Sequence, residues 1–346
     1  ADSVKMRRHA VERDIPCLTS LDTANAIADC LSSNYNVNNV ELVDINKLRD
    51  TRAKLSFSKM QCAGNDFIVF NAIDQVVENP EGLSVRLCNR RKGIGADSLV
   101  MVSLSDKADA AMRIFNQDGS EGKMAGNAIR CVAKYLFDNN VNGIADMIKK
   151  ADEHSANMTI ETEAGVKELT LYMQNGKVSS VKVDMGKPEF TPANIPTRIQ
   201  IPEGKEAIVN APINVEGIDY SATVLSVGNP HCVVFSGFVD KIDVARIGPL
   251  FENHRAFPSR VNAEFVRVVG RNELKVRTWE RGNGETPACG TGACAAAIAA
   301  VLNGHCPMNE DITVKVKGGE LIVNYTGETV FLTGSAELVY EGIIEI

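Results

Sequence analysis

Several features that would place this 346-residue chain in a common functional class are missing from it. There is no basic surplus, because 37 Lys and Arg residues stand against 44 Asp and Glu residues and the net charge is −7. This balance argues against a general binder of nucleic acid or anionic membranes, since either needs a basic face. No stretch approaches the roughly eighteen consecutive apolar residues of a membrane span, so we expect no membrane segment. The sequence does not open on a basic segment followed by an apolar one, so we expect no signal peptide.

Signatures of metal, redox and nucleotide chemistry are also missing. The nine cysteines include no C-x-x-C pair, which leaves little support for zinc binding or thiol–disulfide exchange. The glycine-containing stretches GKPEF, GIGAD and GNGET lack the strand–GxGxxG–helix context of a dinucleotide site. We expect no metal and no cofactor. The cysteines are expected to be reduced thiols of a cytoplasmic protein, most of them small buried hydrophobic residues.

What is present is an ordinary globular composition, with 44% hydrophobic and 23% charged residues. From Leu55 onward, short β-branched segments separated by turn residues predict the strands of antiparallel or mixed sheets. Strands do not alternate strictly with helices, so a doubly wound parallel sheet is not expected. The predicted helices are 83–90, 127–137, 243–253 and 292–302. The predicted strands are 66–72, 98–103, 110–116, 157–162, 167–173, 178–184, 207–213, 221–226, 231–236, 263–269, 274–279, 312–317, 320–325 and 329–333.

Two of the predicted helices have similar beginnings. MAGNAIRC and ACGTGACA align so that Ala125 matches Cys289, at a separation of 164 positions. This is about half of region 55–346, which predicts two similar halves, each with a helix inside a curved sheet. The free backbone N–H groups of such a helix start bind a carboxylate or phosphate and lower the pKa of a cysteine placed there. We therefore expect Cys289 to be a reactive thiol with a lowered pKa; the alternative is a small residue that serves only close packing of the helix.

Other candidate site residues lie at turns and strand ends. The turn before His231 in VGNPHCVVF favours a functional histidine over a structural one. Glu280 and Arg281 precede the loop of Cys289, where the guanidinium could clamp a carboxylate; a solvated strand edge is the alternative. Asparagines also occur at turns, where each has an ordinary conformational explanation. They are Asn65, Asn116, Asn127, Asn229 and Asn262.

Six motifs, taken together and in this order, resemble those of the diaminopimelate epimerases. They are KMQCAGNDF (59–67), GIGAD (93–97), MRIFNQDGSEGKMAGNAIRC (112–131), VDMGKPEF (183–190), VGNPHCVVF (227–235) and ERGNGETPACGTGACA (280–295). The resemblance implies an α/β (α+β) fold of two pseudosymmetric domains, each a mixed β-sheet rolled around a central helix. The implied domains are 55–185 and 186–334, with a strand at 335–346 returning to the first. A homodimer is also implied.

The same resemblance implies inversion of one α-carbon of diaminopimelate between its LL and meso forms, a step toward lysine and peptidoglycan, without pyridoxal phosphate or metal. In the family two cysteines act from opposite faces as thiolate and thiol. The second is Cys289, with Glu280 assisting it, whereas His231 would assist the partner cysteine across the cleft. The partner position is Ala125, which can neither give nor take a proton. Substrate binding is implied for Asn65, Ser98, Asn116, Gly126, Asn127, Asn229, Asn262, Arg281, Gly290 and Thr291.

Alanine at position 125 leaves two explanations open. It is either an engineered replacement, which the unchanged motif around it favours, or the mark of a natural pseudo-enzyme. Cys131 lies about 9 Å further along the helix, too far to substitute. We hypothesise an intact pocket in which epimerisation is nearly abolished, while Cys289 still exchanges the α-proton of one stereoisomer. Rival functions are another cofactor-independent racemase of this fold, an amino-acid-binding module, and a cysteine hydrolase using Cys289 and His231.

Residues 1–54 differ from the rest. A strand at 15–19, a helix at 24–31 and a strand at 40–45 are predicted, too little for an independent core. The stretches at 7–31 and 40–49 resemble the end of the large subunit of carbamoyl-phosphate synthase. This implies a fused or truncated tail without activity of its own; an unrelated docked extension is the alternative.

Overall fold

The computed structural model describes residues 54–123, 125–148 and 151–346, together with residues 6, 8–10, 12, 13, 24, 25 and 28. Its contacts divide the chain into two units, 1–53 and 54–346. In the first unit Ala24, Asn25 and Ala28 are helical, within the predicted helix 24–31. The strands predicted at 15–19 and 40–45 lie outside the described residues. No helix in the described part is long and apolar enough to cross a membrane.

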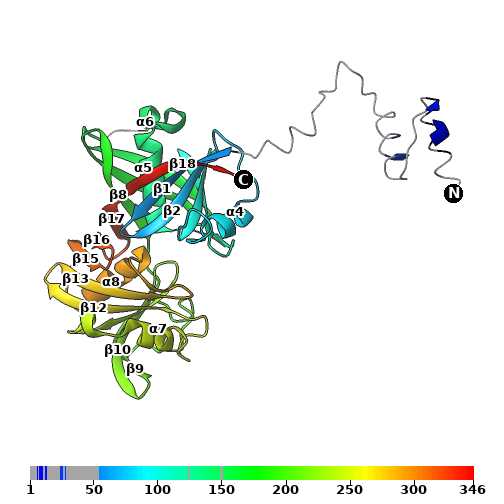
Figure 1. Ribbon diagram of the computed structural model, residues 1–346. Coiled ribbons are helices and arrows are strands. Elements are labelled where there is room, and N and C mark those ends of the chain that lie inside the picture. The colour runs from blue at the N-terminus through cyan, green and yellow to red at the C-terminus, as the bar shows by residue number, and fades with distance from the viewer. Residues whose placement is uncertain are drawn as a thin grey trace. The chain divides into compact units, whose positions relative to one another are not determined.

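The first half of the second unit is an eight-stranded mixed sheet around helix α5 (Gly126–Asp138) (Figure 1). Two neighbouring pairs, β2–β3 and β4–β6, are parallel and the others are antiparallel. The last strand of the chain, β18, pairs with the first, β1. In sheet order the strands are β18 (Glu337–Glu345), β1 (Lys54–Cys62), β2 (Asn65–Asn71), β3 (Ser98–Ser103), β4 (Ala110–Asn116), β6 (Ser155–Thr162), β7 (Gly165–Gln174) and β8 (Lys177–Gly186).

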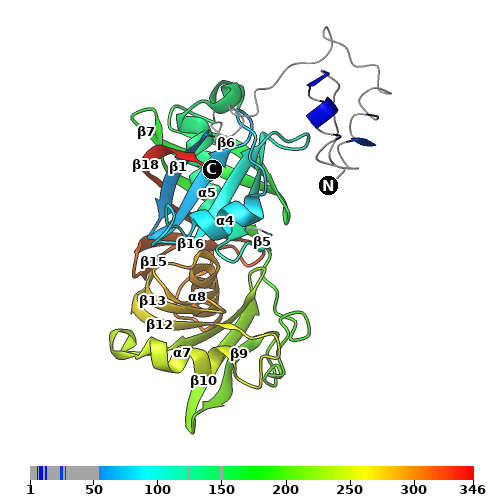
Figure 2. The same ribbon diagram turned by 45° about the vertical axis from the view of Figure 1, so that its right-hand side comes forward.

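The second half repeats this arrangement around helix α8 (Gly290–Leu302), as Figure 2 also shows. Its parallel pairs, β11–β12 and β13–β15, correspond to β2–β3 and β4–β6. Antiparallel pairing of β17 with β8 joins the two halves into one sheet. In sheet order the strands are β17 (Val330–Ser335), β16 (Gly319–Tyr325), β15 (Asp311–Val316), β13 (Glu273–Glu280), β12 (Asn262–Gly270), β11 (Pro230–Phe235), β10 (Ile218–Ser226) and β9 (Ile208–Val215).

The predicted fold class is therefore confirmed, with differences at particular elements. Strand β1 was not predicted, although it lies between β18 and β2. The helix predicted at 83–90 is α4 (Pro80–Leu87), because the Asn79 side chain caps it by accepting from Gly82 N and proline is favoured in the first turn. The remaining elements are β5 (Glu121–Gly122), β14 (Gly284–Thr286), α6 (Ile144–Met147), α7 (Val244–Glu252) and the short 3₁₀ turns Val141–Gly143 and Val239–Lys241.

The central helices α5 and α8 are almost completely buried by the strands around them. Helix α8 is rich in alanine, and its small side chains let strands approach it from several sides. The seven cysteines that the structure describes are all buried and free, and the setting of Cys289 is treated below. Cys17 and Cys30 lie outside the described residues. The first residues of both central helices line one cavity, which places their first turns close together.

Candidate active site

A cavity of about 350 Å³ lies where α5 and α8 begin. Its lining comes from both halves of the sheet. The predicted site residues among its lining are Asn65, Ala125, Gly126, Asn127, Asn229, Glu280, Cys289, Gly290 and Thr291. The lining residues that were not predicted are Lys123, Ala164, Lys167, Met185, Val227, Gly228 and Ala288.

The two helix starts have nearly the same backbone conformation. Ala125 caps α5 with φ −138° and ψ 120°, and Cys289 caps α8 with φ −124° and ψ 114°. The helices approach so closely that a Cβ at Gly290 would lie 3.0 Å from Leu332 and 3.3 Å from Asn127 Oδ1. Glycine is therefore required there for close approach. The first turns of both helices present free backbone N–H groups to one cavity.

The Cys289 thiol is buried against the start of its own helix, with the residue only 6% exposed. Its sulfur accepts a hydrogen bond from Gly292 N at 3.3 Å and lies 3.4 Å from Thr291 Oγ1. Burial, and then the nearby charges of Glu280 and Glu264, nevertheless raise the pKa of Cys289 well above its ordinary value. The expectation of a lowered pKa was therefore wrong, because desolvation outweighs the helix start. The thiol is protonated at neutral pH.

Glu280 ends β13 and faces the cavity beside Cys289. Its carboxylate accepts a hydrogen bond from Thr286 Oγ1. Burial raises the pKa of Glu280, although the hydrogen bond from Thr286 opposes the shift. Glu280 and Cys289 line the same cavity, as predicted, and the charge of Glu280 raises the pKa of the thiol.

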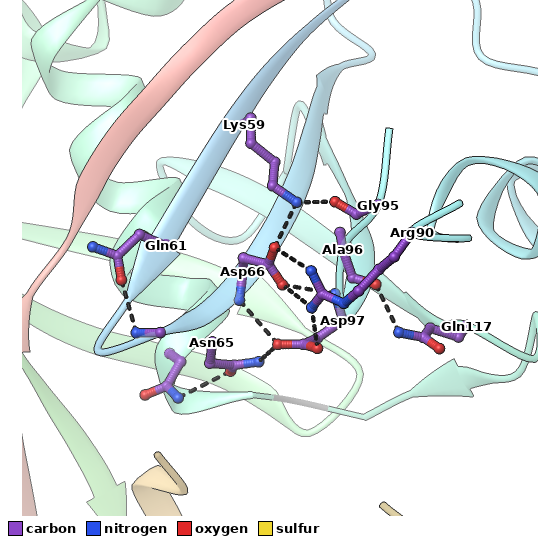
Figure 3. Close-up of polar contacts among 11 residues, drawn as sticks. Lys59, Gln61, Asn65, Asp66, Arg90, Gly95, Ala96, Asp97 and Gln117 are labelled. Atoms are coloured by element: carbon purple, nitrogen blue, oxygen red, sulfur yellow. Dashed lines mark hydrogen bonds and ion pairs between the residues drawn. The ribbon is translucent and has the colours of Figure 1, made fainter. Parts of the chain in front are cut away.

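A hydrogen bond between Asn65 of β2 and Asn127 of α5 joins these two elements in the cavity wall of the first half. Asn127 Nδ2 donates to Asn65 Oδ1 at 3.0 Å, and Asn65 Nδ2 donates to Asp97 Oδ2 at 2.7 Å (Figure 3). Beyond Asp97 lies a cluster of charges that includes Asp66 and Arg90. Burial opposes ionisation there, but hydrogen bonds from Arg90 and Lys59 lower the pKa of Asp66 to about 2. Asp66 therefore stays ionised over the ordinary pH range.

His231 is fully buried in the second half and is not part of the cavity lining. Its Nε2 lies 2.8 Å from Asn229 Oδ1, and its Nδ1 lies 2.8 Å from Glu264 Oε1. Burial raises the pKa of Glu264, although His231 opposes the shift. Both ring nitrogens of His231 thus have a hydrogen-bond partner. Of the two partners, Asn229 lines the cavity, so His231 contacts the cavity wall only through that residue. The proposed catalytic role of His231 stays a prediction.

Four further predicted residues also lie outside the cavity lining. Asn116 donates to Ser120 Oγ at 3.0 Å and is exposed, whereas Ser98 is buried at the start of β3. Asn262 accepts from the backbone N–H of Arg281 at 2.8 Å. The Arg281 guanidinium donates to Ser259 O at 2.9 Å, and its expected role in clamping a carboxylate stays a prediction.

The cavity contains two cations that sequence reasoning missed. Lys123 and Lys167 both line it, and within the described part of the chain neither ammonium has a hydrogen-bond or ion-pair partner. Lys123 lies within the motif MRIFNQDGSEGKMAGNAIRC (112–131), whereas Lys167 follows a hairpin turn that carries no motif. The sequence did contain a further signal for the site. The offset of 164 positions that relates the two helix starts also pairs other candidate site residues: Asn65 with Asn229, Ser98 with Asn262, and Asn116 with Glu280.

Among the described residues, no three His, Cys, Asp or Glu side chains come close enough together to hold a metal ion. The arrangement offers instead a protonated thiol at one helix start, an inert methyl group at the other, and backbone donors from both. Such donors suit a carboxylate, and a titratable group at each cap position would reach opposite faces of a carbon held between them.

The fold matches several solved structures. A hydroxyproline epimerase from Agrobacterium vitis superimposes with a TM-score of 0.60 at 15% identity, covering 86% of this chain and 93% of that one. A PhzF-family phenazine biosynthesis protein from Bacillus anthracis gives 0.59 at 16% identity, covering 85% of this chain and 100% of the other. By fold the protein is thus similar to an epimerase and to a PhzF-family protein.

Sequence comparison narrows the class to one family. The family model described as diaminopimelate epimerase matches residues 57–191 and 223–339. A diaminopimelate epimerase from Acetivibrio thermocellus is 44% identical over 294 residues, covering 84% of this chain and 99% of the relative. One from Methanococcus maripaludis is 43% identical, covering 84% and 100%. The chain belongs to the diaminopimelate epimerase family.

Proposed function

We propose that the cavity binds diaminopimelate and is built to invert one of its α-carbons between the LL and meso forms. The observation that carries the proposal is the pair of helix starts, which bring positions 125 and 289 to one cavity. The first backbone N–H groups of α5 and α8 would hold the reacting carboxylate with preorganised donors. Family membership at 44% identity supports the same substrate.

Inversion needs a base on one face of the α-carbon and an acid on the other. The base removes the α-proton, the electron pair stays on the α-carbon, and the acid delivers a different proton to the opposite face. Cys289 is suited to be the acid for one stereoisomer, because its raised pKa keeps the thiol protonated; for the other stereoisomer its thiolate would be the base. The base would stand at position 125, where alanine has no titratable group. This chain should therefore bind substrate and turn it over very slowly.

The two lysines extend this proposal to the end of the substrate that does not react. Diaminopimelate carries a second amino-acid head, and an unpaired cation is the natural partner of its carboxylate. Lys123 and Lys167 supply such cations in the same cavity. The Lys123 carbonyl also accepts from Ala164 N at 3.3 Å, which ties its backbone to the hairpin that carries Lys167. We assign the distal carboxylate to this pair.

Calorimetric titration of this chain tests the assignment. Lysine matches diaminopimelate but lacks the distal carboxylate, so we expect it to bind about tenfold more weakly, the loss of one charge-assisted hydrogen bond. Lys167→Met should weaken diaminopimelate binding by a similar factor and leave lysine binding unchanged. Lys177→Met, an exposed lysine outside the cavity, is the control and should change neither. Equal affinities for the two amino acids would refute the assignment.

A second candidate function is amino-acid binding without turnover, which Ala125 alone favours. A different amino-acid substrate for the same fold is a third. A panel of amino acids in the same titration separates substrates, and restoring a thiol at position 125, treated in the Discussion, separates binding from catalysis.

We also propose a homodimer that uses the outer edge of β18, around Val339 and Ile343. Among the residues that the structure describes, this strand pairs with β1, and it exposes Val339 and Ile343 to 55% and 69%. Apolar edge strands readily pair with a second chain. We expect Ile343→Lys to convert a dimer into a monomer in sedimentation experiments. Ile218→Lys, on an exposed apolar position of the other half, should leave the dimer intact; dimers in both variants would exclude this edge.

The remaining expectations follow from the proposed activity. We propose that the enzyme works in the cytoplasm, in keeping with the buried free thiols of the described cysteines. Its acidic charge favours a small-molecule partner over nucleic acid. We further propose domains at 55–185 and 186–334, with β18 returning to the first domain, and no catalytic role for residues 1–54.

A further inference from the structure

A row of four side chains runs through the cavity wall, with a charge at each end. Asp97 accepts from Asn65, Asn65 accepts from Asn127, and Asn127 Oδ1 accepts from Arg130 Nη2 at 2.7 Å. Only the two central amides line the cavity. We propose that Asp97 and Arg130 are positioning residues, which set the atoms that Asn65 and Asn127 present to a bound carboxylate. The proposal rests on the function proposed above.

The chemistry of the two ends sets the direction of both amides. A carboxylate can only accept hydrogen bonds, so the Asn65 group that faces Asp97 must be its NH₂. A guanidinium can only donate, so the Asn127 group that faces Arg130 must be its carbonyl. The Asn65 carbonyl and the Asn127 NH₂ then face each other, as the 3.0 Å hydrogen bond requires. Reversing Asn65 would set its carbonyl against the Asp97 carboxylate and its NH₂ against that of Asn127. Reversing Asn127 would set its NH₂ against Arg130 and its carbonyl against that of Asn65.

This direction decides what the cavity offers. Each NH₂ group has two N–H donors, and the row uses one from Asn65 and one from Asn127. The second donor of each remains for the cavity, beside the free backbone N–H groups of the helix starts. This side of the site therefore presents donors together, which suits the two oxygens of a carboxylate. A reversed amide would bring a carbonyl oxygen to the same place and repel it.

Asp97 is itself held in place by further hydrogen bonds. Arg90 Nη2 donates to Asp97 Oδ1 at 2.7 Å, and Asp66 N donates to Asp97 Oδ2 at 3.0 Å (Figure 3). Arg90 also donates both terminal nitrogens to Asp66, whose second cation is Lys59, only 6% exposed. At the other end Arg130 is fully buried, and Asn127 Oδ1 is its hydrogen-bond acceptor in the row. Both ends of the row are thus held in place by hydrogen bonds.

The duplicated fold does not require this carboxylate. In the second half the position equivalent to Asp97, 164 residues later, is Val261, yet Asn229 still lines the cavity as Asn65 does. Asn229 is contacted there by His231, which takes the place of Phe67. Each half therefore orients its asparagine with a different charged or polar group. A role in orientation explains why the first half carries an acid where the second has valine.

Asp97→Asn tests the proposal. The substitution keeps the shape of the side chain, but the new amide can both donate and accept, so it no longer requires Asn65 to present its NH₂ group. We expect the dissociation constant for diaminopimelate to rise about tenfold, since the amides can now adopt either direction. Asp109→Asn is the matched control. Asp109 also accepts two hydrogen bonds, from Thr159 N and Oγ1, but lies on the exposed surface away from the cavity. The control should lose comparable thermal stability and no affinity.

A double-mutant cycle separates positioning from a general structural effect. In an Asn65→Ala background, Asp97→Asn should cause no further loss of affinity; additive losses, or an unchanged affinity in the folded single variant, would overturn the proposal. If Asp97→Asn fails to fold, Arg90→Gln replaces it, because that side chain is half exposed. It should weaken binding two- to threefold, again only when Asn65 is present.

A measurement without ligand keeps this proposal distinct from the proposed function. The side-chain NH₂ resonances of Asn65, identified by their loss in Asn65→Ala, should show one strongly hydrogen-bonded proton. We expect that proton to lose its downfield shift in Asp97→Asn and to keep it in Asp109→Asn. A chain that shows this shift but binds no diaminopimelate would contradict the function and leave the orientation standing. Unchanged resonances in Asp97→Asn would refute the orientation.

Discussion

Replacing Ala125 by cysteine is expected to raise the rate of LL-to-meso conversion by at least about 10²- to 10⁴-fold, the usual contribution of one general acid–base group. The new thiol would stand at the cap of α5, with the same backbone conformation that Cys289 has at the cap of α8. It would also find an equivalent donor, because Ala128 N corresponds to Gly292 N. Conversion is measured by a stereospecific assay of the meso product.

Ala125→Ser is the matched control for this experiment. Serine has nearly the size of cysteine, but its hydroxyl is far too weakly acidic to act as the second base. We expect it to bind diaminopimelate as this chain does and to remain inactive. A well-folded Ala125→Cys protein that binds but does not convert diaminopimelate would show that the two-cysteine assignment is wrong for this chain.

Cys289→Ala is expected to abolish exchange of the substrate α-proton with solvent. In the chain as it stands, Cys289 is the titratable thiol at the two helix starts, so one stereoisomer should still incorporate deuterium from heavy water. Loss of that thiol should lower the exchange by at least about 10²-fold. Cys294→Ala is the control, since Cys294 is buried on the same helix outside the cavity lining. Exchange that survives Cys289→Ala would point to another base, such as Glu280.

The pH dependence of this exchange has a defined sign. Proton abstraction needs the thiolate, and burial together with Glu280 and Glu264 raises the pKa of Cys289. The exchange rate should therefore keep rising with pH beyond the range in which an ordinary thiol ionises. Glu280→Gln removes one nearby negative charge, so it should lower the pKa and shift the profile to lower pH. A shift to higher pH would contradict this account.

Much of the site was predictable because it lies in short motifs with local geometry. The cap positions 125 and 289, the glycines that follow them, and the turn residues Asn65 and Asn229 were all named from sequence and all line the cavity. A helix start or a tight turn depends on a few neighbouring residues, which one sequence displays. Strand positions were predictable for the same reason. The exception is β1, where the alternation of Leu55 and Phe57 with serines changes phase at the bulge between Lys59 and Met60.

Side-chain direction was less predictable. Arg281 stands next to Glu280 in the sequence, but its guanidinium turns to the carbonyl of Ser259 rather than to the cavity. His231 follows a conspicuous turn, yet its ring is enclosed by Glu264 and Asn229. Where a side chain points depends on strand register and on the partners that packing supplies, and these come from distant segments.

The sequence by itself determined the duplicated architecture, the two helix starts and the absence of a thiol at position 125, because each is written in local spacing or in the identity of one residue. Only the tertiary structure decided the ionisation of Cys289 and the direction of the cavity amides. A pKa depends on desolvation and on charges such as Glu264, 25 residues away in sequence, and an amide takes its direction from the groups that folding places at its two ends.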